Sequence, residues 1–192
     1  MTKKEKAIYL LKNYGYLAVL MLCAIVIIIA VVVSSGKAQP VSNQNNVNVS
    51  SGRVSMYLPV LNATVTKSYS NTSLQYNETL KQYEAHMAMD FVASAGSKVY
   101  SVLDGTVTEV GNNYLQGNYV VISHDNGLKS VYSSLDEGVT VSKGDAVKKG
   151  DIIGAVGCSA YSELNEGSHL HFELLDNDKK IDPAGYLNIE NK

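Results

Sequence analysis

The sequence predicts an all-β domain of antiparallel sheets, sandwich-like or barrel-like, after a single N-terminal transmembrane helix and a flexible stalk. Short runs of β-branched residues separated by Gly, Asn and Asp predict the β domain, and no amphipathic helix of useful length follows residue 57. An uninterrupted apolar run near the N-terminus predicts the membrane helix. The chain of 192 residues has room for one ordinary domain plus these appendages, and its formal net charge of -2 gives no reason to expect a nucleic acid as partner.

The N-terminal third predicts an anchor and a linker. Residues 1–13 carry four lysines against one glutamate, and residues 14–33 carry no charge. A helix of about 20 residues spans a bilayer core, so we expect 14–33 to cross the membrane with 1–13 in the cytoplasm. A cleaved signal peptide is the alternative, but the apolar run is long for one and no small-x-small cleavage site follows it. Residues 34–57, rich in Ser, Asn, Gln and Val, are expected to form the stalk, and 58–192 an extracytoplasmic domain.

Strands and turns are predicted along this domain. We expect a short strand within 63–69, a loop over the mostly polar stretch 70–84, and hairpin turns at Asp104-Gly105 and Asn126-Gly127, where positive φ suits the residue types. The remaining strands are expected at residues 98–103, 105–110, 117–123, 128–135, 152–156 and 168–175.

An internal near-repeat occupies residues 143–153. Both copies read Lys-Gly-Asp-x-(Val/Ile), which predicts two similar turns, each followed by a branched residue in the core. Biotinyl and lipoyl carrier domains use similar turns. Such carriers need an exposed lysine on a hairpin tip, usually beside Met in the biotinyl case, and no Met-Lys pair occurs in this chain. A carrier would also have no use for the histidines described next.

Two short fragments carry the side chains that suit a metal. Alternation within residues 167–173 places His169 and His171 on one face of a strand and the intervening apolar residues on the other. Upstream, His86 and Asp90 offer a further imidazole and a carboxylate. Together the fragments can supply His, Asp and His to zinc, with a fourth position open to water. The competing interpretation is that these histidines are ordinary strand residues without a metal.

The fragments and their surroundings resemble the LytM or M23 family of zinc endopeptidases over roughly residues 58–187. The resemblance also rests on the near-repeat and on two runs, Asp104-Gly105-x-Val107 and Gly117-Asn118-Tyr119-Val120-Val121-Ile122-x-His124. Members of this family cut peptide cross-bridges or stems of bacterial peptidoglycan. The resemblance implies that His86, Asp90 and His171 bind Zn²⁺ and that His169 is catalytic. Zinc with three protein ligands keeps an open position and lowers the pKa of a bound water to about 7.

One catalytic position departs from the family pattern. Active members carry a second catalytic histidine in a Tyr-x-His-Leu run, which here reads Tyr132-Ser133-Ser134-Leu135. Ser134 therefore occupies the place of this histidine, and a neutral hydroxyl is no base near pH 7. His124 matches a structural histidine of the family. Loss of a general acid–base group typically costs about 10²–10⁴-fold in rate, so we expect a site that binds zinc but hydrolyses poorly or not at all.

The anchor, the stalk, Ser134 and the insert Tyr161-Ser162-Glu163 resemble in particular the sporulation members of the family. The resemblance implies a forespore membrane protein whose C-terminal domain meets a mother-cell membrane protein in the intermembrane space, in the engulfment and intercellular-channel complex. Three hypotheses remain open. The domain is a zinc-binding adaptor with a degenerate peptidase site, a working peptidoglycan endopeptidase that uses His169 with water or Ser134, or a structural domain without metal.

Overall fold

The computed structural model describes Lys4 and residues 54–189 of the chain. The predicted transmembrane helix 14–33 lies outside the described residues, as do nearly all of the predicted cytoplasmic segment and most of the predicted stalk. Among the described residues, none belongs to a helix with the length and apolar character needed to cross a membrane.

The domain consists mostly of antiparallel β-strands, which confirms the all-β part of the predicted fold class. Helical segments are short, and the longest described one spans six residues. The elements, in chain order, are β1 (Thr64–Lys67), β2 (Leu74–Asn77), β3 (Gln82–Ala85), β4 (Met89–Val92), β5 (Lys98–Tyr100), β6 (Gly105–Asn113), β7 (Gly117–Ser123), η1 (Asp125–Gly127), β8 (Leu128–Leu135), β9 (Ala146–Val147), β10 (Ile152–Ala155), η2 (Tyr161–Glu166), β11 (His169–Asp176), β12 (Lys179–Ile181) and α2 (Ala184–Leu187).

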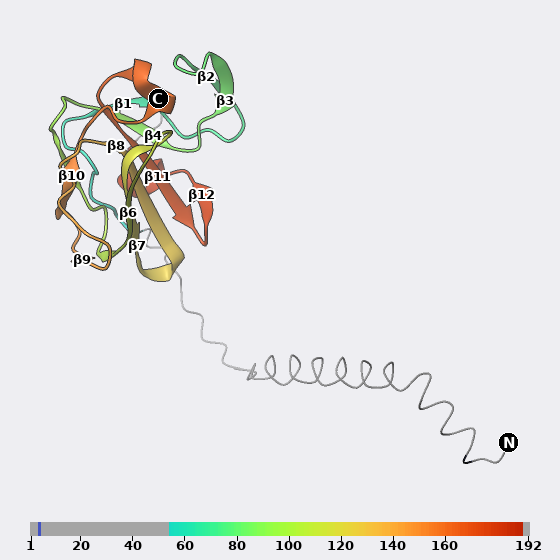
Figure 1. The fold of residues 1–192 in the computed structure, drawn as a ribbon, viewed down its shortest axis with the longest axis vertical. Coiled ribbons are helices and arrows are strands. Elements are labelled where there is room, and N and C mark those ends of the chain that lie inside the picture. Colours follow the sequence, from blue (N-terminus) through green and yellow to red (C-terminus); the bar gives the residue numbers. More distant parts are fainter. Residues whose placement is uncertain (1–3, 5–53, 190–192) are drawn as a thin grey trace. The chain divides into compact units, whose positions relative to one another are not determined.

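One large sheet organises the domain. Its strands follow the order β1-β4-β11-β8-β7-β6-β9, and β12 pairs with β11 beside this path. Two small sheets, β5 with β10 and β2 with β3, complete the strand pairing of the described residues. Figure 1 shows the long strands β11 and β8 within the domain and the β2–β3 hairpin projecting at its edge. The strand that carries both predicted site histidines is therefore an inner strand of the large sheet.

The core lies against β8 and β11. In β11 the alternate side chains of Leu170, Phe172 and Leu174 are fully buried, as the predicted two-residue period requires. Val99 of β5 and Ile153 of β10 belong to the same buried cluster, so the small β5–β10 sheet packs on this core. Burial of apolar surface on this scale is the main stabilising contribution to such a domain.

The expected loop over residues 70–84 is wrong, because this stretch contains the β2–β3 hairpin. Tyr76 and Tyr83 face each other across the hairpin with their ring centroids 5.1 Å apart. Cross-strand aromatic pairs of this kind stabilise a hairpin. Asn77 builds the turn, since its side-chain oxygen accepts two backbone N–H groups at 2.9 Å each. The polar composition concealed the hairpin because most of its side chains are exposed.

The turn expected at Asp104-Gly105 is also wrong. β5 and β6 are not paired, because β5 pairs with β10 and β6 with β7 and β9. Asp104 instead accepts the backbone N–H of Lys149 at 2.8 Å and the ammonium group of Lys148 at 3.0 Å. Gly105 allows a close approach of two strands, since a Cβ there would lie 2.5 Å from the carbonyl oxygen of Ser123.

The other predicted turns are confirmed. Gly127, at a φ of 78°, lies between the paired strands β7 and β8. In the near-repeat, Asp145 and Asp151 each accept the backbone N–H three residues earlier, at 2.8 and 2.7 Å. Val147 and Ile153, two residues after each aspartate, are buried. The two copies therefore form the same turn and each contributes one core residue.

The hydroxyl of Tyr132 generates a prediction about stability. Tyr132 on β8 is fully buried, and its hydroxyl accepts the backbone N–H of Val102 at 2.9 Å. Tyr132→Phe would leave this buried N–H without a partner, so we expect the free energy of unfolding to fall by about 1–3 kcal/mol, measured by urea denaturation. Tyr119→Phe is the control, because it removes an exposed contact with Glu109 and should change stability by about 0.5 kcal/mol at most. An equal loss of unfolding free energy in the two variants would contradict the assigned role of the Tyr132 hydroxyl as the acceptor for Val102.

Candidate metal centre

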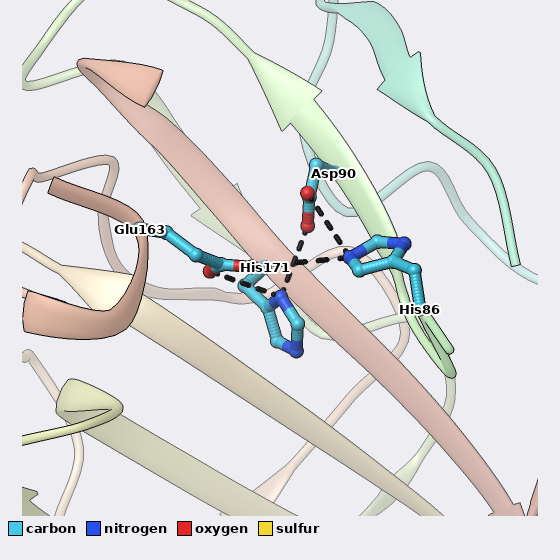
Figure 2. A group of neighbouring side chains, drawn as sticks. All are labelled: His86, Asp90, Glu163 and His171. Carbon is cyan, nitrogen blue, oxygen red and sulfur yellow. Dashed lines mark ion pairs between the residues drawn. The ribbon is translucent and has the colours of Figure 1, made fainter. Parts of the chain in front are cut away.

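The candidate site is assembled where β4 and β11 pair. Asp90 of β4 lies directly opposite His171 of β11 in the antiparallel ladder. Side chains of directly paired residues project from the same face with their Cβ atoms about 4.5–5.5 Å apart, so this register brings carboxylate and imidazole together. His86, four residues before Asp90 and just ahead of β4, is buried beside them. Figure 2 shows the three side chains converging.

The donor atoms of these side chains meet without forming hydrogen bonds. The distance from His86 Nε2 to Asp90 Oδ2 is 3.1 Å, and from His171 Nδ1 to Asp90 Oδ1 it is 3.0 Å. Although all four atoms are buried, none has a hydrogen-bond partner of acceptable geometry. Buried polar atoms in proteins almost always have partners. Lone pairs that converge without hydrogen bonding are the arrangement expected of ligands that share a cation, so these residues fit a metal ion.

Second partners select the tautomer of each imidazole. His86 Nδ1 lies 3.3 Å from the carbonyl oxygen of Ser68, and His171 Nε2 lies 3.4 Å from Glu173 Oε1. Both oxygens only accept, so these two nitrogens carry the protons. The opposite nitrogens, which face Asp90, keep their lone pairs in the neutral rings. A hydrogen bond to the far nitrogen is what orients histidine ligands in metal sites generally.

Charge interactions hold the carboxylates of the cluster ionised. Burial alone would raise the pKa of Asp90, but its contacts with His171 and His86 lower that pKa overall. Burial likewise would lower the pKa of His171, whereas Asp90, Glu163 and Glu173 together raise it well above its usual value. These carboxylates therefore favour a second proton on His171, and a metal ion bound at Nδ1 would take the place of that proton.

Glu163 is a fourth donor that the sequence analysis did not assign. It lies in η2, is buried, and places Oε2 at 3.2 Å from His171 Nδ1 and Oε1 at 3.9 Å from His86 Nε2. One donor atom from each of the four residues lies within 4.8 Å of the other three. In Figure 2 the carboxylate of Glu163 points at His171 from the side opposite His86. The only signal in the sequence is an acidic residue within the insert that precedes His169.

Contacts with two other segments fix η2 over the site. The side chain of Asn77 donates to the carbonyl oxygen of Ser162 at 3.0 Å, and Ser162 Oγ donates to the carbonyl oxygen of Leu115 at 2.7 Å. Tyr161 stacks on Tyr114 with ring centroids 4.1 Å apart. The β2–β3 hairpin and the β6–β7 connection therefore hold the turn that carries Glu163.

His169, the predicted catalytic residue, is engaged at both ring nitrogens. Its Nδ1 lies 2.9 Å from the carbonyl oxygen of Gly167 and its Nε2 lies 3.2 Å from Glu163 Oε2. Burial alone would lower the pKa of His169, but the bond with Glu163 and the bond with Gly167 raise it. Burial would raise the pKa of Glu163, and His169 and His171 more than reverse this. His169 thus binds the carboxylate and presents no free lone pair to act as a base.

A second group of donors, Asp90, Glu166 and His169, also lies within 4.8 Å of one another. Two of its three donors already have other partners, since Glu166 forms an ion pair with Lys67 and both nitrogens of His169 are bound. The first group therefore fits a cation better.

Ser134 and His124 are both buried polar residues, and they differ in their hydrogen bonding. Ser134 on β8 is fully buried at a φ of 61°, and its hydroxyl has no hydrogen-bond partner. His124 is buried with Nδ1 at 2.9 Å from the carbonyl oxygen of Asp104 and Nε2 at 2.7 Å from Ser130 Oγ. His124 thus joins the β5–β6 connection to β8, and both of its ring nitrogens are used in this link.

Comparison with known proteins places this geometry in a family. Stage II sporulation protein Q of Bacillus subtilis (strain 168) is 30% identical over 161 residues, which cover 76% of this chain and 55% of that protein. The chain thus spans little more than half the length of this relative. A chain in the SpoIIQ-SpoIIIAH pore forming complex has a TM-score of 0.60 at 28% identity, and the match covers 70% of this chain and 92% of that one.

A zinc containing peptidase from Vibrio cholerae also has a similar structure, with a TM-score of 0.58 at 30% identity over 71% of this chain and 40% of that one. The sequence profile of peptidase family M23 matches residues 84–183, more than half of the 192 residues. The matched segment includes every side chain of the metal cluster and the residues that orient His169. The chain therefore belongs to peptidase family M23.

Proposed function

We propose that this chain is a membrane-anchored sporulation protein whose M23 domain binds Zn²⁺, has lost hydrolytic activity, and binds a mother-cell membrane partner resembling stage III sporulation protein AH. The observation that carries the proposal is the intact His86, Asp90 and His171 cluster. It is combined with a serine, Ser134, where the family resemblance leads us to expect a catalytic histidine. The similarity to stage II sporulation protein Q and to the SpoIIQ-SpoIIIAH complex supports the partner and the engulfment or intercellular-channel role.

The proposed location follows from the same similarity and from the N-terminal composition. Residues 14–33 would cross the forespore membrane once, with 1–13 in the cytoplasm and the M23 domain in the intermembrane space. The domain would then stand opposite a partner anchored in the mother-cell membrane.

Loss of hydrolysis follows from the side chains around the proposed ligands. His86, Asp90 and His171 would hold the zinc, which in a peptidase polarises the substrate carbonyl and activates water. Proton transfer needs a nearby base, and Ser134 supplies only a neutral hydroxyl. His169 donates hydrogen bonds to the Glu163 carboxylate and to the carbonyl oxygen of Gly167, so neither of its nitrogens is free to accept a proton. Among the described residues no other histidine can serve as this base, because His86 and His171 are proposed ligands and both nitrogens of His124 contact Asp104 and Ser130.

A working peptidoglycan endopeptidase is the second candidate. The complete His-Asp-His cluster and the similarity to a zinc containing peptidase of Vibrio cholerae favour it. In this function His169 would assist hydrolysis, with water or Ser134 completing the site. The two candidates share the metal and differ in chemistry, so an activity measurement separates them.

The first prediction concerns metal content. We expect the purified chain to retain zinc after dialysis, and His86→Ala and His171→Ala to lower the zinc affinity by more than about 100-fold, because loss of outer-shell partners alone typically costs about 10–100-fold. Competition with a chromophoric chelator measures the affinity. Glu137→Gln removes an exposed carboxylate outside the cluster and serves as the control. Full zinc affinity in both histidine variants would show that the ligand assignment is wrong.

The second prediction concerns hydrolysis. Incubated with purified peptidoglycan and zinc, the chain should release no more soluble fragments than the His171→Ala variant does, since the site lacks a free base. Liquid chromatography of the released fragments measures this. Fragment release that disappears in His171→Ala would instead establish the endopeptidase.

The third prediction concerns the partner. We expect the chain to form a complex with the extracytoplasmic domain of the stage III sporulation protein AH of the same organism, with a dissociation constant of about 1 μM or tighter, as isothermal titration measures it. The M23 domain of the Vibrio cholerae peptidase is the matched control and should not bind. Absence of a complex at about 100 μM of both proteins would contradict the adaptor function.

A further inference from the structure

We propose that Glu163 is a fourth ligand of the metal, so that His86, Asp90, Glu163 and His171 close the centre with protein side chains alone. The inference rests on the zinc binding of the proposed function and goes beyond it. It states that the position a peptidase leaves open to water is filled by a carboxylate.

The distances between donor atoms carry the proposal. Ligands about 2.1 Å from zinc at tetrahedral angles lie roughly 3.4 Å from one another. His86 Nε2 lies 3.1 Å from Asp90 Oδ2 and 3.9 Å from Glu163 Oε1. His171 Nδ1 lies 3.0 Å from Asp90 Oδ1 and 3.2 Å from Glu163 Oε2. These separations, each taken from an imidazole nitrogen to the nearer carboxylate oxygen, lie within about 0.5 Å of the tetrahedral value. The carboxylate of Glu163 therefore lies at a distance from the two imidazoles that suits a ligand of the same metal ion.

The balance of charge in the cluster favours Glu163 as a ligand of the metal. Asp90 and Glu163 are both almost completely buried in one cluster, where two like charges repel each other unless a cation lies between them. A divalent cation held by two neutral imidazoles and two carboxylates carries no net charge. With only one carboxylate the same buried centre would carry a net positive charge. Structural zinc sites with four protein ligands are closed in this way.

His169 acts in this arrangement as a positioning residue. Its Nε2 donates to Glu163 Oε2 at 3.2 Å, and its Nδ1 is fixed by the carbonyl oxygen of Gly167 at 2.9 Å. It therefore orients the carboxylate of Glu163 as an outer-shell partner orients a ligand. The turn itself is held by Asn77 and by the stacked ring of Tyr161. Glu163 is thus held at the cluster by the contact of its side chain with His169 and by the contacts of its neighbours Tyr161 and Ser162.

The competing interpretation is that Glu163 only forms an ion pair with His169. One coordination position of the metal would then stay free, and a small anion could bind there. Such binding changes the absorption spectrum of a bound metal probe. The test therefore measures both the affinity for a metal and the access of an added anion to that metal.

The experiment uses the full chain loaded with Zn²⁺ alone or with Co²⁺ alone. Zinc affinity is measured by chelator competition, and the visible absorption of cobalt, which depends on coordination number, is recorded with and without azide. Variants are Glu163→Ala, the isosteric Glu163→Gln, His169→Asn, and the exposed control Glu137→Gln. Circular dichroism checks folding, and Glu163→Gln keeps the test decisive if the alanine variant does not fold.

We expect both Glu163 variants to lose at least about 10-fold in zinc affinity and their cobalt spectra to change on adding azide. The wild-type and Glu137→Gln spectra should not respond to azide. His169→Asn should lose affinity while keeping the azide-insensitive spectrum. Unchanged affinity and an unchanged cobalt spectrum in Glu163→Gln and Glu163→Ala would overturn the fourth ligand while leaving zinc binding intact. A wild-type chain that binds neither metal would overturn both the ligand and the proposed zinc function.

Discussion

Asp90 and His171 face each other because β4 and β11 pair in one particular antiparallel register. Their alternate neighbours Phe91, Leu170 and Phe172 are buried in the core, so the register that fills the core also points carboxylate and imidazole to the other face. A slip of one residue would exchange the two faces, exposing the apolar side chains and burying the charged ones apart. The candidate metal centre is thus specified by the hydrophobic packing behind it.

A closed centre would change what the metal does for the domain. The proposed ligands come from the segment before β4, from β4, from η2 and from β11. A metal shared by these elements stabilises the folded state directly, because the unfolded chain has no comparable site. The buried carboxylates of Asp90 and Glu163 then gain a further cationic partner besides the histidines that already lower their pKa values. In this interpretation the peptidase fold retains its metal as a structural support after losing its chemistry.

The sequence predicted the parts of the structure whose signals are local. The strands over 117–123 and 128–135 have the predicted bounds, since alternation and the Asn126-Gly127 turn mark them plainly. The β2–β3 hairpin depends on one aromatic pair and one asparagine in a polar stretch, which no periodicity reveals. The two sequence fragments predicted a His, Asp and His set, and the family resemblance then selected His171 as the ligand and His169 as the catalytic residue. Glu163 was missed because its direction is decided by contacts of η2 with distant segments, which the sequence does not encode locally.

The hairpin and η2 are joined by more than one bond, and this has a thermodynamic consequence. Besides the bond from Asn77 to Ser162, the backbone N–H of Asn165 donates to Thr79 Oγ1 at 2.9 Å. If Glu163 binds the metal, whatever holds the hairpin against η2 also holds a ligand in place. A protein that binds the hairpin in this position must then tighten metal binding. By reciprocity the metal must tighten the binding of that protein by the same factor, so metal supply would regulate assembly without any hydrolysis.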